Sequence, residues 1–243
     1  KPNLYTLLYE GVIGVMFIYC INLILFFISL FILIYFTYNP KSYYRFIFKT
    51  TTSILFIFTA IISYVISPGN YYYFSLLTLG LFFSLLGDMF LAININTKDG
   101  SLNKSFIYGA ISFSLTHIMY VLAFTHLGSF NILDLLIALI LSFIAISILR
   151  CNKNMNFKNM LLPISLYSFI ICLMTFESIK LVFLLKSNIG AYLLLIGALL
   201  FIFSDLVLSF ILFNNKHKKI LNGLNLITYY TGQFIIASTI LFL

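Results

Sequence analysis

Two aspartates lie within long apolar stretches of this 243-residue chain, Asp88 in GLFFSLLGDMFLA and Asp205 in GALLFIFSDLVLS. A carboxylate at the centre of a membrane helix costs about 2.5 to 3.5 kcal/mol on insertion scales, so we expect a function for each of them. Two acids that meet in one site can act as a general acid beside a general base. The structural alternative is that the acids hold helices together by hydrogen bonds or form an ion pair with Lys49.

The two stretches also share a pattern, in which Gly is followed by seven residues, Asp, two residues and Leu. The copies are offset by 117 residues, close to half the chain. On a helix, small residues fall on the same face as each acid and allow a neighbouring helix to approach closely, so we expect both acids to face the bundle interior. These small residues are Gly80, Ser84 and Gly87 beside Asp88, and Gly197 and Ser204 beside Asp205.

The composition is typical of a membrane protein, because 62% of the residues are hydrophobic and only 8% are charged. That charged fraction is about a third of the fraction in a soluble domain. Apolar runs of about 20 residues cross a bilayer as helices, which satisfy their own backbone hydrogen bonds. We predict an all-α, polytopic membrane protein with eight transmembrane helices in one membrane domain, residues 1–243. The predicted spans lie near residues 14–38, 46–67, 71–96, 105–127, 131–149, 160–180, 188–213 and 220–243.

The positions of the two acidic spans predict how the spans are arranged. Four spans separate the copies, so both copies cross the membrane in the same direction. We therefore predict two parallel four-helix repeats, about residues 1–125 and 126–243, related by an axis along the membrane normal. Each acid is expected about 12 Å from the end of its helix, at the same level as the other.

The net charge of +8 is distributed unevenly along the chain. Alternate connections carry ten basic residues, the opposite side carries three, and Lys49 lies within a span. Because basic residues accumulate on the cytoplasmic side, we predict a multi-pass protein of the cell membrane with both termini outside. Membrane lipids are the expected surroundings, and no soluble basic surface is predicted for nucleic acid. The ten are Lys41, Arg45, Lys98, Lys104, Arg150, Lys153, Lys158, Lys216, Lys218 and Lys219, and the three are Lys1, Lys180 and Lys186.

Polar residues also follow each acidic span on the next predicted helix, and they predict a polar cavity that opens toward the inner leaflet. They are Thr116, His117 and Tyr120 in SLTHIMYVLAF, and Tyr229, Tyr230 and Gln233 in LITYYTGQFIIAS. For His117, a structural hydrogen bond and a catalytic or orienting role are both open. The tyrosines and the glutamine fit helix packing as well as substrate contact. Lys49 fits snorkelling to the surface, a substrate phosphate or a pair with Asp88.

Several other chemistries do not match the sequence. It contains no Gly-rich phosphate loop, nucleophile elbow or dinucleotide fingerprint. One histidine deep in a span and two distant acids make a poor zinc site, which needs about three protein ligands. The three cysteines have neither metal-ligand nor disulfide spacing. We therefore predict neither a metal nor a cofactor.

Five segments, taken in order, make the chain resemble the YhhN family of multi-span membrane proteins, which includes the lysoplasmalogenases. They are SLLGDMFLA, SLTHIMYVLAF, LYSFIICLM, GALLFIFSDLVLS and YYTGQFIIAS, within about residues 45–243. By this resemblance the family's functional residues correspond to Lys49, Asp88, His117, Tyr120, Asp205, Tyr230 and Gln233. The chain departs from the family at Thr50, where Pro is common, and at Ser209, where Ala is usual.

The resemblance implies hydrolysis of the vinyl ether bond of lysoplasmalogen, a lysophospholipid, to a fatty aldehyde and a glycerophospho-base. One of Asp88 and Asp205 would be a protonated general acid and the other an ionised carboxylate, in an order that the sequence leaves open. Lys49 would meet the phosphate. The residues expected to position water or the glycerol oxygens are His117, Tyr120, Tyr230 and Gln233.

Two alternatives use the same residues differently. Parallel repeats with acids inside the membrane are equally compatible with a proton-coupled transporter or a lipid-binding membrane protein. An intramembrane aspartyl protease is disfavoured, because Leu85 stands where the Gly-x-Gly-Asp pattern of that class requires glycine.

Overall fold

The chain folds into a bundle of α-helices. A computed structural model describes residues 4–39, 42–93, 104–214 and 218–243, and these residues form eight α-helices and no β-strand. The predicted all-α fold is confirmed, with 88% of the structure helical. The helices are α1 (Leu4–Tyr38), α2 (Ser42–Ile66), α3 (Tyr71–Ala92), α4 (Lys104–Leu127), α5 (Ile132–Cys151), α6 (Leu161–Leu184), α7 (Ile189–Phe213) and α8 (Ile220–Ser238).

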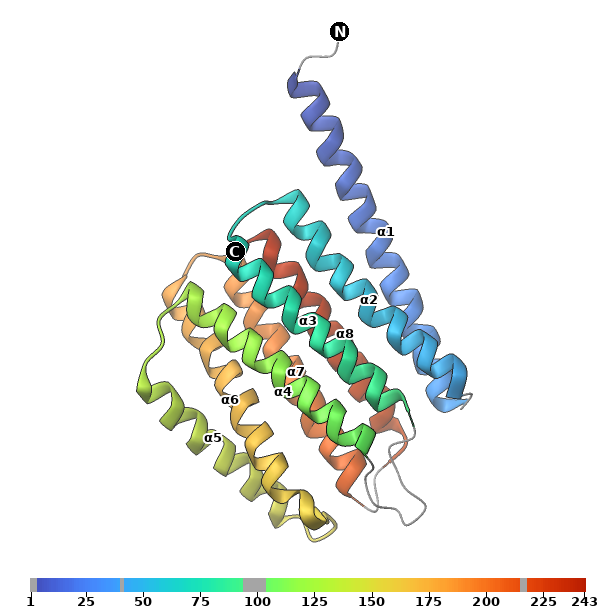
Figure 1. The fold of residues 1–243 in the computed structure, drawn as a ribbon, viewed down its shortest axis with the longest axis vertical. Coiled ribbons are helices and arrows are strands. Elements are labelled where there is room, and N and C mark those ends of the chain that lie inside the picture. Colours follow the sequence, from blue (N-terminus) through green and yellow to red (C-terminus); the bar gives the residue numbers. More distant parts are fainter. Residues whose placement is uncertain (1–3, 40–41, 94–103, 215–217) are drawn as a thin grey trace.

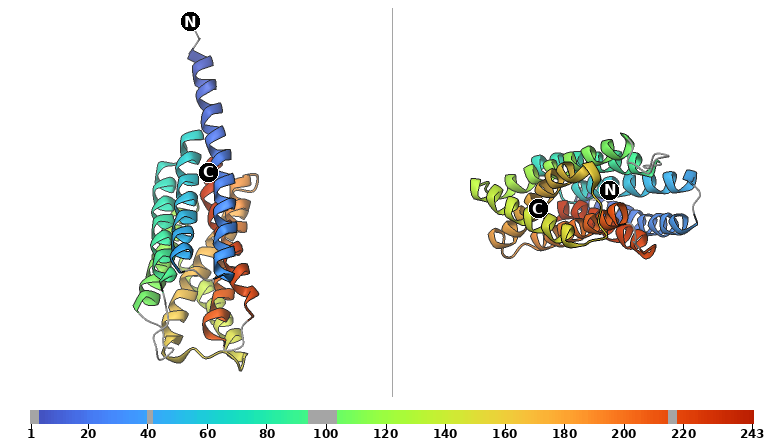
Figure 2. Two further views of the ribbon diagram at one scale, coloured as in Figure 1. Left: turned by 90° about the vertical axis from the view of Figure 1, so that its right-hand side faces the viewer. Right: turned by 90° about the horizontal axis from the view of Figure 1, so that it is seen from below.

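Most helices pack against their neighbours in the chain, but α6 and α8 also contact helices that are farther away in the sequence. The helix α6 packs on α4, and α8 packs on both α1 and α2. Figure 1 shows α1 and α5 at opposite edges of the bundle, with α8 beside α2 and α3. The first part of α1 projects beyond the other helices, and the C-terminus lies toward that same end (Figures 1 and 2).

Asparagines set the start of three helices at the end of the bundle where the C-terminus lies. The side chain of Asn70 accepts a hydrogen bond from the Tyr73 backbone N–H, and Asn188 accepts one from the Gly190 N–H. Asn131 caps α5 in a capping box with Asp134. Each cap satisfies a backbone donor that the helix itself leaves unpaired.

Seven of the described helices, α1 to α7, are long and apolar enough to cross a membrane. The prediction of eight apolar spans is corrected at the last one, residues 220–243, which contains α8 and a short 3-10 helix, η2 (Thr239–Leu241). The helix α8 falls short of these seven in mean hydropathy, and much of its surface is buried against other helices. Tyr230 and Gln233, for example, are fully buried between helices.

The basic residues that the structure describes lie mainly at the end where α2, α4, α6 and α8 begin, which we call the basic end. Arg45, Lys104, Arg150, Lys218 and Lys219 stand at or near helix ends there. The predicted charges at Lys1, Lys41, Lys98 and Lys216, and residues 94–96 of the third predicted span, lie outside the described residues.

The small residues beside the acids do allow close helix packing, as predicted. The clearest case is the contact of α7 with α8, where a Cβ added at Gly197 would lie 2.6 Å from Ile236 Cγ1 and 3.0 Å from the Gly232 carbonyl oxygen. Gly197 therefore sets how closely α8 approaches the helix that carries Asp205.

We expect Gly197→Ala to lower the stability of the bundle by about 1 to 3 kcal/mol, because the added methyl overlaps the backbone of α8. Thermal unfolding of the purified protein in detergent measures this. The matched control is Gly14→Ala in α1, where nothing lies within 4 Å of the added methyl. Equal unfolding temperatures for the two variants would contradict the close approach.

Candidate active site

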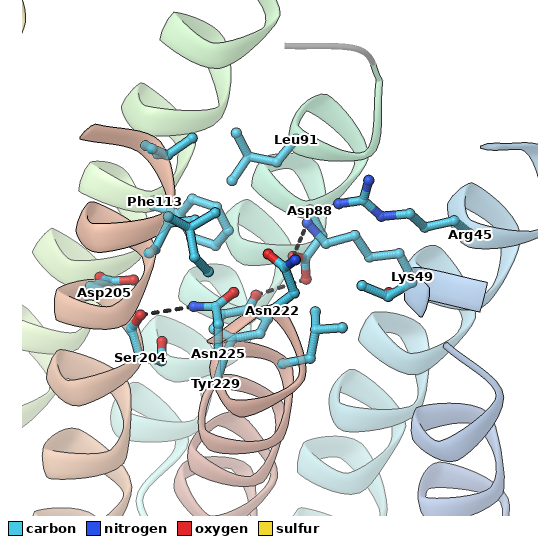
Figure 3. Close-up of a pocket in the computed structure, with 15 residues that line it drawn as sticks. Arg45, Lys49, Asp88, Leu91, Phe113, Ser204, Asp205, Asn222, Asn225 and Tyr229 are labelled. Atoms are coloured by element: carbon cyan, nitrogen blue, oxygen red, sulfur yellow. Dashed lines mark hydrogen bonds and ion pairs between the residues drawn. The ribbon is translucent and has the colours of Figure 1, made fainter. Parts of the chain in front are cut away.

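A polar cavity of about 110 Å³ lies near the basic end and is lined by both predicted acids, Asp88 and Asp205. It is large enough for several water molecules. Figure 3 shows Asp88 on the α3 side and Asp205 on the α7 side, with Tyr229 of α8 and Phe113 of α4 between them. Its other labelled lining residues are Arg45, Lys49, Leu91, Ser204, Asn222 and Asn225.

Asp88 is held by three donors and is only 1% exposed. Lys49 Nζ lies 3.2 Å from its Oδ1 atom. Ser53 Oγ and the Tyr229 hydroxyl donate to Oδ2 at 2.6 and 2.7 Å. A buried charge is tolerated when it is paired and hydrogen-bonded. Of the alternatives open for Lys49, the structure shows the ion pair with Asp88.

A chain of hydrogen bonds reaches Asp88 from deep in the bundle. The Tyr120 hydroxyl donates to Gln233 Oε1 at 2.6 Å, and Gln233 Nε2 donates to Ser84 Oγ at 2.6 Å. Ser84 Oγ lies 2.6 Å from the Tyr229 hydroxyl, whose single proton goes to Asp88. Ser84 must therefore donate to Tyr229, so every donor in the chain points toward the carboxylate.

Four of the five predicted substrate-binding residues lie behind the cavity wall, and His117 is one of them. Tyr120, Tyr230 and Gln233 are fully buried and are not among the residues that line the cavity. Tyr230 donates a hydrogen bond to the Lys49 backbone carbonyl at 3.2 Å and lies 3.4 Å from Ser53 Oγ. Tyr120, Tyr230 and Gln233 are connected to Asp88 through Lys49, Ser53 and Tyr229. Their position is therefore that of residues that hold the groups around Asp88 in place.

Asp205 has a separate set of partners and is more open than Asp88, with 15% of its side chain exposed. The Tyr167 hydroxyl donates to Asp205 Oδ2 at 2.5 Å. His117 Nε2 lies 2.9 Å from that hydroxyl and 3.8 Å from Asp205 Oδ2. Because the Tyr167 proton is already donated, His117 Nε2 must carry the proton between the two rings. The other ring nitrogen, Nδ1, lies 3.3 Å from Met174 Sδ.

The two acids lie at different distances from their helix ends, whereas about eight residues were predicted for both. The described part of α3 ends at Ala92, four residues after Asp88, whereas α7 continues for eight residues after Asp205. These intervals are about 6 and 12 Å along a helix. The helices are staggered, and the acids still reach one cavity.

The sequence did not identify several residues of the site. Arg45 lines the cavity, although its place in a connection predicts only a charge that sets topology. Tyr167 contacts Asp205 and stands in LYSFIICLM, a segment with no predicted site residue. The contact of Ser53 with Asp88 could not be predicted, because a serine in a helix is common and its partner lies 35 residues away.

The comparisons with known proteins place this site within a family. The model described as the YhhN family matches residues 44–240. The chain belongs to the YhhN family. Comparison with curated proteins and with solved structures gives no match. The matched range contains both acids and their partners on α2 to α8, and it leaves out α1, for which the sequence offered no distinctive family segment.

In this YhhN protein, we expect Lys49→Met to destabilise the fold by about 3 to 5 kcal/mol, because it leaves the Asp88 carboxylate buried without its counter-ion. Thermal unfolding in detergent measures the change. The double variant Lys49→Met with Asp88→Asn should recover most of the loss.

The matched control is Lys186→Met, which removes an exposed lysine at the other end of the bundle and should change stability little. A Lys49→Met protein as stable as the parent would show that the pair does not form.

Proposed function

We propose that this YhhN protein is a membrane-embedded hydrolase that cleaves the vinyl ether bond of lysoplasmalogen. The observation that carries the proposal is one polar cavity lined by two acids from different helices, Asp88 and Asp205, with the basic residue Arg45 also in its wall. Family membership supports a lysoplasmalogenase-like activity. The products would be a fatty aldehyde and a glycerophospho-base.

The reaction needs one proton donor, one water molecule and no redox step. An acid protonates the alkene carbon that is not bonded to oxygen, which produces an oxocarbenium ion. Water attacks the carbon beside the oxygen and loses a proton to a carboxylate. The hydroxyl of the resulting hemiacetal then loses its proton to one carboxylate as the bond to the glycerol oxygen breaks, and the glycerol oxygen takes up a proton from the other acid. Two acids in one cavity can supply the donor and the acceptor.

The contacts favour Asp88 as the ionised carboxylate. Lys49, Ser53 and Tyr229 are all donors to it, and an ionised carboxylate has about four acceptor positions. The position that remains can accept a proton from the attacking water. Its negative charge would also stabilise the oxocarbenium ion.

The same reasoning favours Asp205 as the general acid. Its Oδ2 atom accepts from Tyr167, and no hydrogen bond from the described residues occupies Oδ1. That oxygen is free to carry the proton that the alkene carbon receives. His117 and Tyr167 form a hydrogen-bonded route through which the proton could be replaced. Of the roles that the sequence left open for His117, we therefore propose the catalytic or orienting one over a purely structural hydrogen bond.

The arrangement of the cavity also fits the polar part of the substrate. Arg45 is exposed, and no carboxylate of the described chain is paired with it. Lys49, one helical turn further in, is already paired with Asp88. We therefore assign the phosphate to Arg45 in place of Lys49. One turn is about 5.4 Å, which suits the few bonds between phosphate and vinyl ether. Asn222 and Asn225 line the cavity and would meet the glycerol oxygens.

The proposal includes the membrane arrangement predicted from the sequence: two parallel four-helix repeats in the cell membrane, with the basic end in the cytoplasm. The helix contacts support the two repeats. When each of the first four helices is matched with the helix four positions later, the contact of α4 with α6 corresponds to the contact of α8 with α2. The substrate would then enter from the inner leaflet.

We expect Asp88→Asn and Asp205→Asn each to reduce aldehyde release from lysoplasmalogen by about a hundred- to ten-thousandfold, because each removes a proton donor or acceptor. Purified protein in detergent, with aldehyde measured directly, provides the test. The matched control is Asp134→Asn at the other end of the bundle, outside this cavity, which should keep the parent rate. Near-normal release from either variant would remove that acid from the mechanism. No release from the parent, together with acid-dependent solute movement in liposomes, would favour a transporter.

A second test concerns the phosphate. We expect Arg45→Gln to raise KM for lysoplasmalogen by about ten- to a hundredfold with little change in kcat, because a charged hydrogen bond made throughout the reaction is lost. Steady-state kinetics measures both constants. Arg150→Gln, which changes an exposed arginine near the same end, is the control. An unchanged KM in Arg45→Gln would show that the phosphate lies elsewhere.

A further inference from the structure

A second, mostly apolar cavity of about 70 Å³ lies between α5, α6 and α7. Aliphatic side chains from all three helices line it, among them Ile146 of α5, Ile171 of α6 and Ile202 of α7. Its polar wall includes Asp205 and Tyr167. The same two residues form the short hydrogen bond of the candidate active site.

We propose that this cavity, called the chain cavity below, holds the first methylene groups of the substrate's single hydrocarbon chain. The inference rests on the proposed function and adds the position of the chain. Asp205 lines both the polar cavity and the chain cavity. A lysophospholipid has the same division, with a polar headgroup and an apolar chain that separate at the ether oxygen. The bond to be cleaved would therefore lie at Asp205.

The chain cavity also leads in the right direction. It reaches Ile171 and Cys172, ten and eleven residues after the start of α6, or about 15 Å from the basic end. It comes to the bundle surface at Leu206, which is 36% exposed. The rest of the chain would leave the protein at that point and lie among the lipid tails.

A third cavity competes for the chain and fits it less well. It is also lined by Asp205 and Tyr167, but several of its other residues, including Phe106, Pro163 and Phe213, stand near helix ends at the basic end. A chain in that cavity would return toward the membrane surface beside its own headgroup. Apolar chains lie in the hydrocarbon core instead.

Binding in the chain cavity positions the substrate more than it increases affinity. Lipid tails are as apolar as the cavity wall, so moving the chain from lipid to protein changes hydrophobic burial little. Ordering the first methylenes would, however, keep the alkene carbon beside Asp205. The side chains that line this cavity should consequently affect turnover and chain selectivity.

Cys172 allows a direct test, because it lines the chain cavity and is buried, whereas Cys20 and Cys151 are exposed. In a protein carrying Cys20→Ser and Cys151→Ser, Cys172 is the remaining thiol of the three. The protein in lipid nanodiscs is labelled with N-ethylmaleimide, with and without a hexadecyl ether lysophospholipid that has no vinyl group and cannot be hydrolysed. We expect this ligand to slow labelling at least tenfold. Glycerophosphoethanolamine, which has the headgroup and no chain, should leave the rate unchanged.

A second variant covers the case in which Cys172 reacts too slowly to measure. Cys172→Phe should fill the chain cavity and weaken binding of the hexadecyl ether ligand at least tenfold while leaving glycerophosphoethanolamine binding within twofold. Cys20→Phe, on an exposed face of α1, is the control and should change neither. Equal labelling rates with and without the ligand, or equal binding by the two phenylalanine variants, would overturn the proposal.

Aldehyde release by the double-serine protein, measured in parallel, separates this proposal from the proposed function. Release without protection of Cys172 would overturn the chain cavity and leave the hydrolase standing. Protection without release would overturn the hydrolase and leave a lipid-binding protein whose ligand chain lies in this cavity.

Discussion

The buried ion pair between Lys49 and Asp88 is the interaction around which the candidate site is organised. A lysine and an aspartate in the interior of a membrane bundle are each unfavourable alone, and their pairing makes both tolerable. Asp88 needs further donors, and Ser53 and Tyr229 provide them. The requirement to satisfy one carboxylate thus brings α2, α3 and α8 together and fixes the wall of the polar cavity.

The two acids differ in their surroundings, and the proposed division of roles between acid and base depends on this difference. Asp88 is buried and is held by donors from two helices, α2 and α8, whereas Asp205 is partly exposed and contacts Tyr167 and His117. Two identical side chains can serve as acid and base when their environments differ. The stagger of α3 and α7 adds to this asymmetry, since it places the acids at unequal distances from their helix ends.

Much of this arrangement could be predicted from the spacing of residues along each helix, and the remainder depends on contacts between helices. The spacing of Gly80, Gly87 and Gly197 showed which face of each acidic helix is buried. It did not show which helix would cover that face. Tyr167 was missed for this reason, because α6 lies between α4 and α7 and the sequence gives no sign of that neighbour. Hydropathy placed the ends of most helices within a few residues. The exceptions are that α1 begins ten residues earlier, at Leu4, that α3 ends at Ala92, and that α8 is polar.

The polarity of α8 has a consequence for how the protein is made. A segment with two asparagines, a glutamine and several hydroxyls is a poor substrate for insertion by its own hydrophobicity. It has to be received by helices already in the bilayer, and α1, α2, α3 and α7 all contact it. Until α8 docks, Asp88 lacks the hydroxyl of Tyr229, so the wall of the polar cavity is incomplete. Docking of α8 therefore completes both the helix bundle and the set of donors around Asp88.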